Sequence, residues 1–383
     1  MSLHFSRAEF AERQQRTIEQ LKSRHLDGLL MFRQESMYYL SGYDSFGFVF
    51  FQCLYLGADG RLMLLTRAPD LRQAQHTSVI EDIRIWEDRA DADPAVQLKD
   101  ILDEFKCKGK TLGVEYDAYG LTAKNGKLLE AALADFCTLK DASNIVSRLR
   151  VVKSAAEMKY VRQAAMLADL ACDEAHRLTG PGADEGDILA AMQGVIFAGG
   201  GDYPGNEFII GSGEDALLCR YKSGRRKLDD QDQLTLEWAA AYRHYHAAMM
   251  RTIPVGRAAD LHEKMHRVTT DAMNACMAAL KPGRPIGEVF DAYARVCDTA
   301  GMKDHRLNAT GYSMGATFAP NWMDWPMFYH GNPVIAAPNM VFFLHMILMD
   351  SDTNHAMCFG HTVVVTETGS ESLSDRSLDL VVR

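Results

Sequence analysis

The stretch Leu234-Thr-Leu-Glu-Trp-Ala-Ala-Ala-Tyr-Arg-His-Tyr-His-Ala-Ala-Met-Met-Arg-Thr252 places one carboxylate, Glu237, in an otherwise apolar run. Carboxylates are uncommon in such runs unless they are partnered. Burial would raise the pKa of Glu237 and make it usable as a general base or, when ionised beside a reactive carbon, as a nucleophile. The alternative is a structural glutamate paired with Arg243 or Arg251. Taken alone, the residue types favour this structural alternative.

Two histidines follow in the segment Tyr242-Arg-His-Tyr-His246. If this segment is a continuous strand, Tyr242, His244 and His246 face one way and the two residues between them face the other. Two imidazoles on one face can transfer protons near neutral pH. The alternative for each histidine is an ordinary hydrogen-bonded position in a sheet.

The opening stretch resembles the hairpin of the creatinase/prolidase/aminopeptidase P family. The pattern of that family has an Asp, a second Asp eleven residues later, and then x-x-Arg-Thr. Here Glu237 stands at the first position and Ala248 at the second, just before Met249-Met-Arg-Thr252. Because the family position of Glu237 belongs to the active site, the resemblance reverses the preference for a purely structural role.

Three further motifs of this family are present with their metal ligands replaced. His-Gly-x-Gly resembles Gly311-Tyr-Ser-Met-Gly315, with Tyr312 in place of the ligand histidine. Phe-Thr-Ile-Glu-Pro resembles Val341-Phe-Phe-Leu-His-Met346, and Glu-Asp-Thr-Val resembles Gly360-His-Thr-Val363. Divalent ions in such sites need several carboxylate or imidazole ligands around one point. At most Glu237 and His345 remain, so the resemblance predicts a site without a metal or any other cofactor.

Two features resemble the ectoine hydrolases in particular. One is Glu237 followed by Arg243-x-Tyr-His246 and Arg251-Thr252, and the other is Gly311-Tyr-Ser-Met-Gly315 followed by Pro320-Asn-Trp322 and Asp324-Trp-Pro326. The resemblance implies that Glu237 attacks, or activates water toward, an electron-poor amidine carbon. It assigns His246 and Tyr312 to proton transfer and hydrogen bonding. Aromatic walls from Trp322 and Trp325 suit a small zwitterion with a delocalised cationic ring, whereas a packed turn with a tryptophan lid is the alternative.

The remaining candidate residues are expected to bind the substrate, a small molecule. Arg220 follows the turn Ser212-Gly-Glu-Asp215, at a position where creatinase has a histidine, and its guanidinium can clamp a substrate carboxylate. His244 and His345 are further candidates. Tyr43 and Asp44 lie in a segment that resembles the loop these enzymes lend to a neighbouring subunit, so the resemblance implies a homodimer.

Bulk properties exclude several classes of partner. A chain of 383 residues has room for two domains, and a net charge of −10 argues against nucleic acid and anionic membranes as main partners. The sequence contains no run of eighteen apolar residues, so no membrane span is expected. The first residues lack the apolar core of a signal peptide. The eight cysteines form no CxxC motif, which is typical of a protein in a reducing compartment. We therefore expect a cytoplasmic protein.

The pattern of elements predicts a domain boundary near residue 150. Residues 1–150 alternate helix-like and strand-like segments, as in an α/β domain. A capping box, Ser154-Ala-Ala-Glu157, then opens a long helix of a second domain at 151–383. There we expect helices near 184–198, 257–281 and 286–300 and strands near 207–211, 233–253, 340–349 and 361–366. This α+β pattern, sharpened by the resemblance, predicts a pita-bread catalytic domain with a curved, mainly antiparallel sheet.

Two other functions stay open on the sequence. One is an Xaa-Pro peptidase with an unusual metal site, and the other is an inactive relative that only binds a ligand. The segment His262-Glu-Lys-Met-His266 matches the HExxH motif of zinc peptidases. It falls where the pita-bread fold has an outer helix, so we do not predict a zinc site there.

Overall fold

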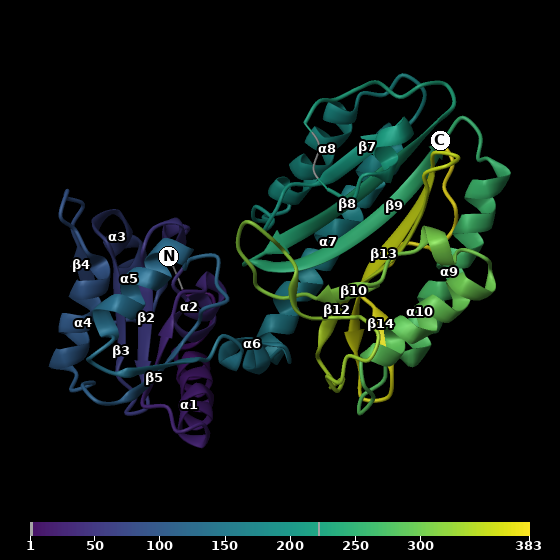
Figure 1. Cartoon of the computed structure of the whole chain (residues 1–383). Coiled ribbons are helices and arrows are strands. Elements are labelled where there is room, and N and C mark those ends of the chain that lie inside the picture. The colour runs from purple at the N-terminus through teal and green to yellow at the C-terminus, as the bar shows by residue number, and fades with distance from the viewer. Residues whose placement is uncertain (1–2, 221–222) are drawn as a thin grey trace. The chain divides into compact units, whose positions relative to one another are not determined.

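The computed structural model describes residues 3–220 and 223–383, which divide between Arg150 and Val151 into two units (Figure 1). The first unit has a six-stranded sheet in the order β4-β3-β2-β1-β5-β6. The pairs β1–β2 and β2–β3 are antiparallel, and the other three pairs are parallel. Its elements are α1 (Arg7–Ser23), β1 (Gly28–Met31), α2 (Gln34–Ser41), β2 (Cys53–Gly57), β3 (Leu62–Arg67), α3 (Ala68–Thr77), β4 (Asp82–Trp86), α4 (Pro94–Glu104), β5 (Thr111–Val114), α5 (Ala123–Leu133), β6 (Thr138–Asp141) and α6 (Ile145–Arg150).

Both faces of this sheet are covered because the central strand is apolar throughout. Leu30 and Phe32 pack into one core cluster, and Leu29 and Met31 pack into a second cluster. Side chains alternate along a strand, so the two clusters lie on opposite faces. A short 3-10 helix at Gly47–Val49 precedes β2.

The second unit is built around an eight-stranded sheet in which every strand pair is antiparallel. The strand order is β11-β10-β12-β13-β9-β8-β7, and β14 pairs with β13. The strands are β7 (Ile209–Ser212), β8 (Asp232–Tyr242), β9 (Tyr245–Val255), β10 (Gly311–Ser313), β11 (Asp324–Met327), β12 (Val341–Asp350), β13 (His355–Val365) and β14 (Ser370–Ser372). The helices are α7 (Ala155–Leu178), α8 (Glu185–Ala198), α9 (Asp260–Ala279) and α10 (Gly287–Thr299). The predicted fold class, an α/β unit followed by an α+β pita-bread unit, is confirmed.

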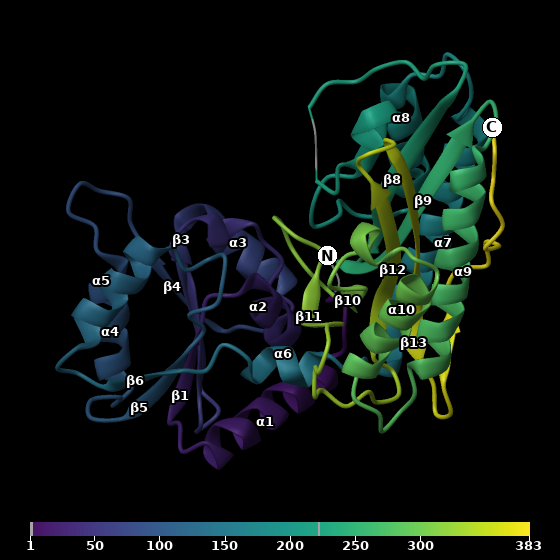
Figure 2. The same ribbon diagram turned by 45° about the vertical axis from the view of Figure 1, so that its right-hand side comes forward.

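Helices cover one face of this sheet. The helix α7 packs on β8 and β9, whereas α9 packs on β12, β13 and α10 (Figure 2). The predicted capping box begins α7, because the Ser154 side chain accepts from Glu157 N and the Glu157 carboxylate accepts from Ser154 N. Along β12, Phe342, Leu344 and Met346 pack into the core beneath α9 and α10. The intervening side chains therefore point to the opposite face.

The strand expected at 233–253 is two strands joined by a tight turn. Arg243 and His244 both have positive φ, 52° and 63°, as the two central residues of a type I′ turn require. The predicted alternation of Tyr242, His244 and His246 along one strand is therefore wrong, since His244 lies in the turn and β9 restarts at Tyr245. Among residues 3–220 and 223–383, no helix combines the length and apolar content of a membrane span.

Candidate active site

Glu237 lies in the middle of β8, on the face opposite to the helices. Its neighbour Trp238 points toward α7 and donates through Nε1 to the carbonyl of Ala168 at 3.1 Å. Because adjacent side chains alternate, Glu237 points to the other face. It is 8% exposed, and the register places it between Ile209 of β7 and Met250 of β9. The strand thus holds the carboxyl group in a largely apolar setting.

Two aromatic side chains orient the Glu237 carboxyl group. Trp322 donates through Nε1 to the Tyr312 hydroxyl at 2.8 Å, and that hydroxyl donates to Glu237 Oε1 at 3.1 Å. Both rings are buried, with 1% and 4% exposure. The indole N–H occupies one acceptor position of the phenol, so the phenol proton is directed at the carboxylate. The structure thus brings the three predicted residues Glu237, Tyr312 and Trp322 together through two hydrogen bonds.

Burial is the main influence on the Glu237 charge. It raises the pKa of Glu237 to about 7, against the Tyr312 hydrogen bond and the positive charge of Arg220, which both lower it. Within the described residues, nothing donates a hydrogen bond to Oε2. The structural alternative of an ion pair with Arg243 or Arg251 is absent there too, since Arg251 donates to Met250, Gly360 and His361. Glu237 therefore has a free carboxylate oxygen and a pKa suited to base or nucleophile chemistry near neutral pH.

His345 lies near the Tyr312 ring and has a ring nitrogen without a hydrogen-bond partner in the described residues. The ring centroids of His345 and Tyr312 are 5.7 Å apart, and Phe343 lies 5.5 Å from His345. The Nδ1 atom is buried and has no hydrogen-bond partner in the described residues. Burial lowers the pKa of His345 to about 4, so the imidazole is neutral at pH 7. A buried polar atom without a partner is costly, which makes Nδ1 a position for a substrate atom or water.

The residues around Glu237 do not fit a metal centre. Ala248 pairs with Ala239 and offers only a methyl group. At Gly360 an added Cβ would lie 2.6 Å from the Phe343 ring, so this ring fills the space that a longer side chain would need. The described part of the chain has no cluster of three or more His, Cys, Asp or Glu side chains arranged around one point. The donor set leaves Glu237 and His345, too few ligands for a divalent ion.

Arg220 is a positively charged residue that acts on the site. Its side chain is exposed, and Nη1 donates to the carbonyl of Cys219 at 3.0 Å. Its charge acts on Glu237, Tyr312 and His345, because it lowers the pKa of each of them after the larger effect of burial. Tyr312 itself keeps its proton, since burial and the neighbouring Glu237 raise its pKa well above the usual value. Arg220 is thus a cation beside a buried carboxyl group.

His246 has a different setting from the one predicted. Its Nε2 accepts from Gly205 N at 2.8 Å, so the proton is on Nδ1, which faces Thr317 Oγ1 at 3.1 Å and the Gly315 carbonyl at 3.4 Å. Burial lowers its pKa to about 4. The cross-strand partner of His246 is Ala241, four residues beyond Glu237 on β8. Proton transfer by His246 is therefore not supported, because both nitrogens are occupied and the ring lies along the strand from Glu237.

The remaining predicted residues are distributed more widely. His244 stacks on Phe318 with ring centroids 4.3 Å apart, and Trp325 packs at the edge of the core beneath α9 and α10. Tyr43 is fully buried in the first unit and donates to Gln52 Oε1 at 3.3 Å, which argues against direct contact with a substrate. Asp44, half-buried in the same unit, accepts from Gln73 through its carbonyl at 2.7 Å. The structure joins none of these four side chains to Glu237 by a hydrogen bond.

The HExxH motif on α9 forms no metal site. His262 Nε2 lies 2.9 Å from Gln233 Oε1, and His266 Nε2 lies 2.8 Å from the carbonyl of Leu378. Because oxygen acceptors hold both Nε2 atoms, each carries a proton there and is not a metal donor. The motif contributes to the packing of an outer helix.

Three residues that the sequence did not single out support the site. Asn206 accepts from Trp322 N through Oδ1 at 3.1 Å, and Thr317 Oγ1 lies 3.4 Å from the Trp322 carbonyl. Phe343 fills the space beside Gly360. The alternation of Phe343 with His345 on β12 was a usable signal for Phe343. The Asn206 contact, in contrast, joins loops that are distant in sequence.

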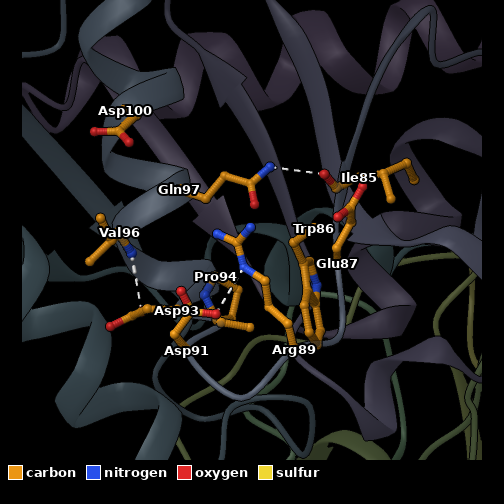
Figure 3. Close-up of a pocket in the computed structure, with 11 residues that line it drawn as sticks. Ile85, Trp86, Glu87, Arg89, Asp91, Asp93, Pro94, Val96, Gln97 and Asp100 are labelled. Atoms are coloured by element: carbon orange, nitrogen blue, oxygen red, sulfur yellow. Dashed lines mark hydrogen bonds and ion pairs between the residues drawn. The ribbon is translucent and has the colours of Figure 1, made fainter.

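A separate surface hollow lies in the first unit, next to the start of α4 (Figure 3). Its polar groups serve local structure: Asp93 caps α4 by accepting from Ala95 N and Val96 N, and Gln97 donates to the Ile85 carbonyl at 2.9 Å. Arg89 pairs with Asp91 at 3.2 Å. None of the predicted functional residues lines it.

Known proteins match both units. The family model for metallopeptidase family M24 matches residues 159–367, and the creatinase/prolidase N-terminal domain matches residues 13–152. An ectoine hydrolase from Halomonas elongata is 25% identical over 400 residues, covering 100% of this chain and 99% of the relative. An Xaa-Pro dipeptidase from Pyrococcus furiosus is 21% identical over 372 residues, covering 97% and 99%. The crystal structure of a prolidase from Thermococcus sibiricus has a TM-score of 0.87 at 18% identity, covering 98% and 99% of the two chains.

Proposed function

The chain belongs to metallopeptidase family M24, and we propose that within this family it is a metal-independent hydrolase of a non-peptide C–N bond. The proposed substrate is a small carboxylated amidine or amide. Relatives in this family include an ectoine hydrolase and Xaa-Pro dipeptidases, which are hydrolases of C–N bonds. The proposed substrate class is like that of the ectoine hydrolase, because the metal ligands expected of an Xaa-Pro dipeptidase are replaced in this chain.

The observation that carries the proposal is the Glu237 carboxyl group. It is buried, its pKa is near neutrality, one oxygen accepts from Tyr312 and the other has no protein partner in the described residues. This arrangement supplies a base or nucleophile without a metal-bound water. The replacement of ligand positions by Ala248, Tyr312 and Gly360 supports the same proposal.

Glu237 can act either as a general base or as a nucleophile, and atoms and protons balance in both reactions. When Glu237 acts as base, it takes a proton from water, the water oxygen bonds to the amidine carbon, and one C–N bond breaks as the leaving nitrogen regains the proton. When Glu237 acts as nucleophile, its oxygen bonds to the amidine carbon, and the C–N bond breaks as the leaving nitrogen takes a proton from water. The hydroxide that remains then cleaves the resulting mixed anhydride and releases the Glu237 carboxylate. In both forms Tyr312 stabilises the charge on the carboxylate.

Substrate binding would use the neighbouring groups. Arg220 would pair with the substrate carboxylate, and the unused Nδ1 of His345 would bind a polar substrate atom. Trp322 would form an aromatic wall and fix the Tyr312 hydroxyl. We assign His246 a positioning role, because it ties Gly205 to the segment 315–317 that precedes Trp322.

We also propose a homodimer. The segment after Tyr43 and Asp44 exposes three apolar side chains, with Phe46 76%, Val49 58% and Phe50 45% exposed. Exposed apolar patches of this kind favour association with another surface. Light scattering that finds a fully active monomer would exclude this part of the proposal.

The proposal is tested by activity after metal removal. The purified protein is treated with EDTA, dialysed, and screened by thermal shift against ectoines, creatine, betaines and Xaa-Pro dipeptides, and stabilising compounds are then assayed for turnover. We expect turnover of an amidine or amide that EDTA does not reduce. Loss of activity with EDTA, and its return with manganese, cobalt or zinc, would instead identify an Xaa-Pro peptidase with an unusual site.

The same screen tests whether the protein is an inactive relative that only binds a ligand. A compound that raises the melting temperature but is never converted identifies a binding protein. The Glu237→Ala variant serves as control, because a hydrolysis that persists in this variant comes from a contaminant or from another site.

A further inference from the structure

Arg251 is a buried cation with no carboxylate in contact with it. The side chain is 5% exposed, on the face of β9 opposite to Met250, which pairs with Glu237. Its Nη1 donates to the carbonyls of Met250 at 2.8 Å and Gly360 at 3.1 Å, and its Nη2 donates to Nε2 of His361. All three partners are neutral. The described residues place no carboxylate oxygen in hydrogen-bond or ion-pair contact with this guanidinium.

An isolated buried charge is expensive, and nearby groups compensate it only in part. The guanidinium lies 4.0 Å from the centroid of the Phe359 ring, a cation–π contact. Asp169 acts on Arg251 through space, but its oxygens accept from Ser374 Oγ at 2.6 Å and Asp375 N at 2.9 Å. Burial lowers the pKa of Arg251, yet a guanidinium keeps its proton in proteins. A further negative partner would therefore lower the cost of burying this charge.

The histidines around Arg251 supply no such partner. Because Nε2 of His361 accepts from the guanidinium, its proton is on Nδ1, which lies 3.2 Å from Ser372 Oγ. Burial and the charge of Arg251 lower the pKa of His361 well below the usual value, and burial lowers that of His176 to about 4. These rings are neutral at pH 7. They add neither a competing positive charge nor a negative one.

A small cavity adjoins the unused donors. Three of the five guanidinium N–H groups are engaged in the hydrogen bonds described above, which leaves two. The cavity, about 10 Å³ in volume, is bounded by Arg251, Phe359, His176 and His266 and by Leu380 and Val381 of the C-terminal segment. Asp379, which is exposed, also borders it. The cavity therefore has room for a small occupant beside the guanidinium.

We propose that this cavity binds a single small anion, chloride under ordinary conditions, as the counter-ion of Arg251. The C-terminal segment closes over it: Arg383 N donates to the Pro254 carbonyl at 3.0 Å, and Gly256 N donates to the Arg383 carbonyl at 2.5 Å. The site is independent of Glu237, since the two residues lie on opposite faces of the sheet. Its role is to stabilise the fold of the second unit.

The position of His361 allows a direct test. A carboxylate at position 361 would lie within reach of Arg251 Nη2 and would replace the bound anion. The wild type and His361→Asp are melted in sodium gluconate that is exchanged stepwise for sodium chloride at constant ionic strength. We expect the wild-type melting temperature to rise saturably by roughly 2–6 °C, and that of the variant to stay constant.

The control variant is His76→Asp, which makes the same change on an exposed position of the first unit and should keep the wild-type response to chloride. Equal melting of the wild type in chloride and gluconate would overturn the proposal, and so would a chloride response retained by His361→Asp. Crystals of the wild type in sodium bromide give a second measurement that does not depend on any variant folding. An anomalous peak beside Arg251 is expected, and a crystal with no peak there would refute the site.

Discussion

Two buried glutamates, Glu115 in the first unit and Glu237 in the second, have similarly raised pKa values but accept different numbers of hydrogen bonds. Burial raises the pKa of each to about 7. Glu115 accepts three hydrogen bonds, from Phe32 N at 3.1 Å, Arg33 N at 3.0 Å and Ser36 Oγ at 2.6 Å, and so holds the start of α2. Glu237 accepts one hydrogen bond, from Tyr312.

The difference shows what a raised pKa can and cannot identify. Desolvation alone perturbs both carboxyl groups, so the pKa does not separate a structural glutamate from a reactive one. What separates a structural glutamate from a reactive one is the number of carboxylate lone pairs that the protein leaves for a ligand. Glu115 has both oxygens engaged by the protein, whereas Oε2 of Glu237 has no donor in the described residues. Substitutions at the two positions should therefore affect different quantities.

The largest effect is expected for Glu237→Gln. The amide keeps the volume and an acceptor for Tyr312 but is neither base nor nucleophile, so kcat should fall by roughly 10²–10⁴-fold. The melting temperature should not fall. Ionisation of a carboxyl group with a raised pKa weakens folding as the pH rises from about 4.5 through about 7, and the amide never ionises. Rate assays and melting at pH 8 measure both quantities.

A Glu237→Gln variant with a near-normal rate and a much lower melting temperature would remove the contrast between the two glutamates. It would mean that Glu237, like Glu115, serves the fold. Binding of the unreacted substrate to this variant, measured by calorimetry, should stay close to that of the wild type, because Arg220 and His345 are unchanged.

Tyr312→Phe should produce the next largest effect. It removes the single hydrogen bond to Glu237 and leaves Trp322 Nε1 without its acceptor. Loss of one hydrogen bond to a charged group should reduce kcat by roughly 10–100-fold. A Tyr293→Phe variant, which loses a 3.0 Å bond to the Ile347 carbonyl, is the matched control and should retain its rate. Equal losses of rate in both variants would indicate a general effect on the sheet.

Glu115→Gln should change stability and leave the rate alone. A Gln side chain cannot accept from both backbone N–H groups and from Ser36 with the same two atoms, because one of them becomes an amide donor. The free energy of unfolding should fall by about 1–3 kcal/mol, measured by urea denaturation. A loss of kcat without a loss of stability would contradict the structural role of Glu115.

Short sequence motifs were sufficient to predict one helix start and to single out two residues of the candidate site. The capping box at Ser154 and Glu157 uses atoms three residues apart, and it begins α7 as predicted. Glu237 and the Gly311–Ser313 segment that holds Tyr312 were assigned to the site from the resemblance to family motifs, and the structure joins them through one hydrogen bond. These features depend on few residues and on regular geometry.

Features that depend on tertiary packing were not accessible in the same way. His246 and Glu237 are close in sequence, but the turn at Arg243 and His244 fixes a register that leaves them apart on the sheet. The partners of His246 come from Gly205 and Thr317, on two distant loops. The same is true of Arg251, whose lack of a carboxylate partner is visible only when β9 and β13 are paired.

The smallest expected effect is on the pH profile, and it also distinguishes the two glutamates. Catalysis needs ionised Glu237, so kcat/KM should rise with pH, reach half its plateau near pH 7 and fall about tenfold per unit below that. Because the Tyr312 hydrogen bond lowers the pKa of Glu237, Tyr312→Phe should move the midpoint upward, by less than about one unit. Glu115 titrates in the same range. The Glu115→Gln profile should nevertheless keep the wild-type midpoint, and a shift there would assign the titration to the wrong carboxyl group.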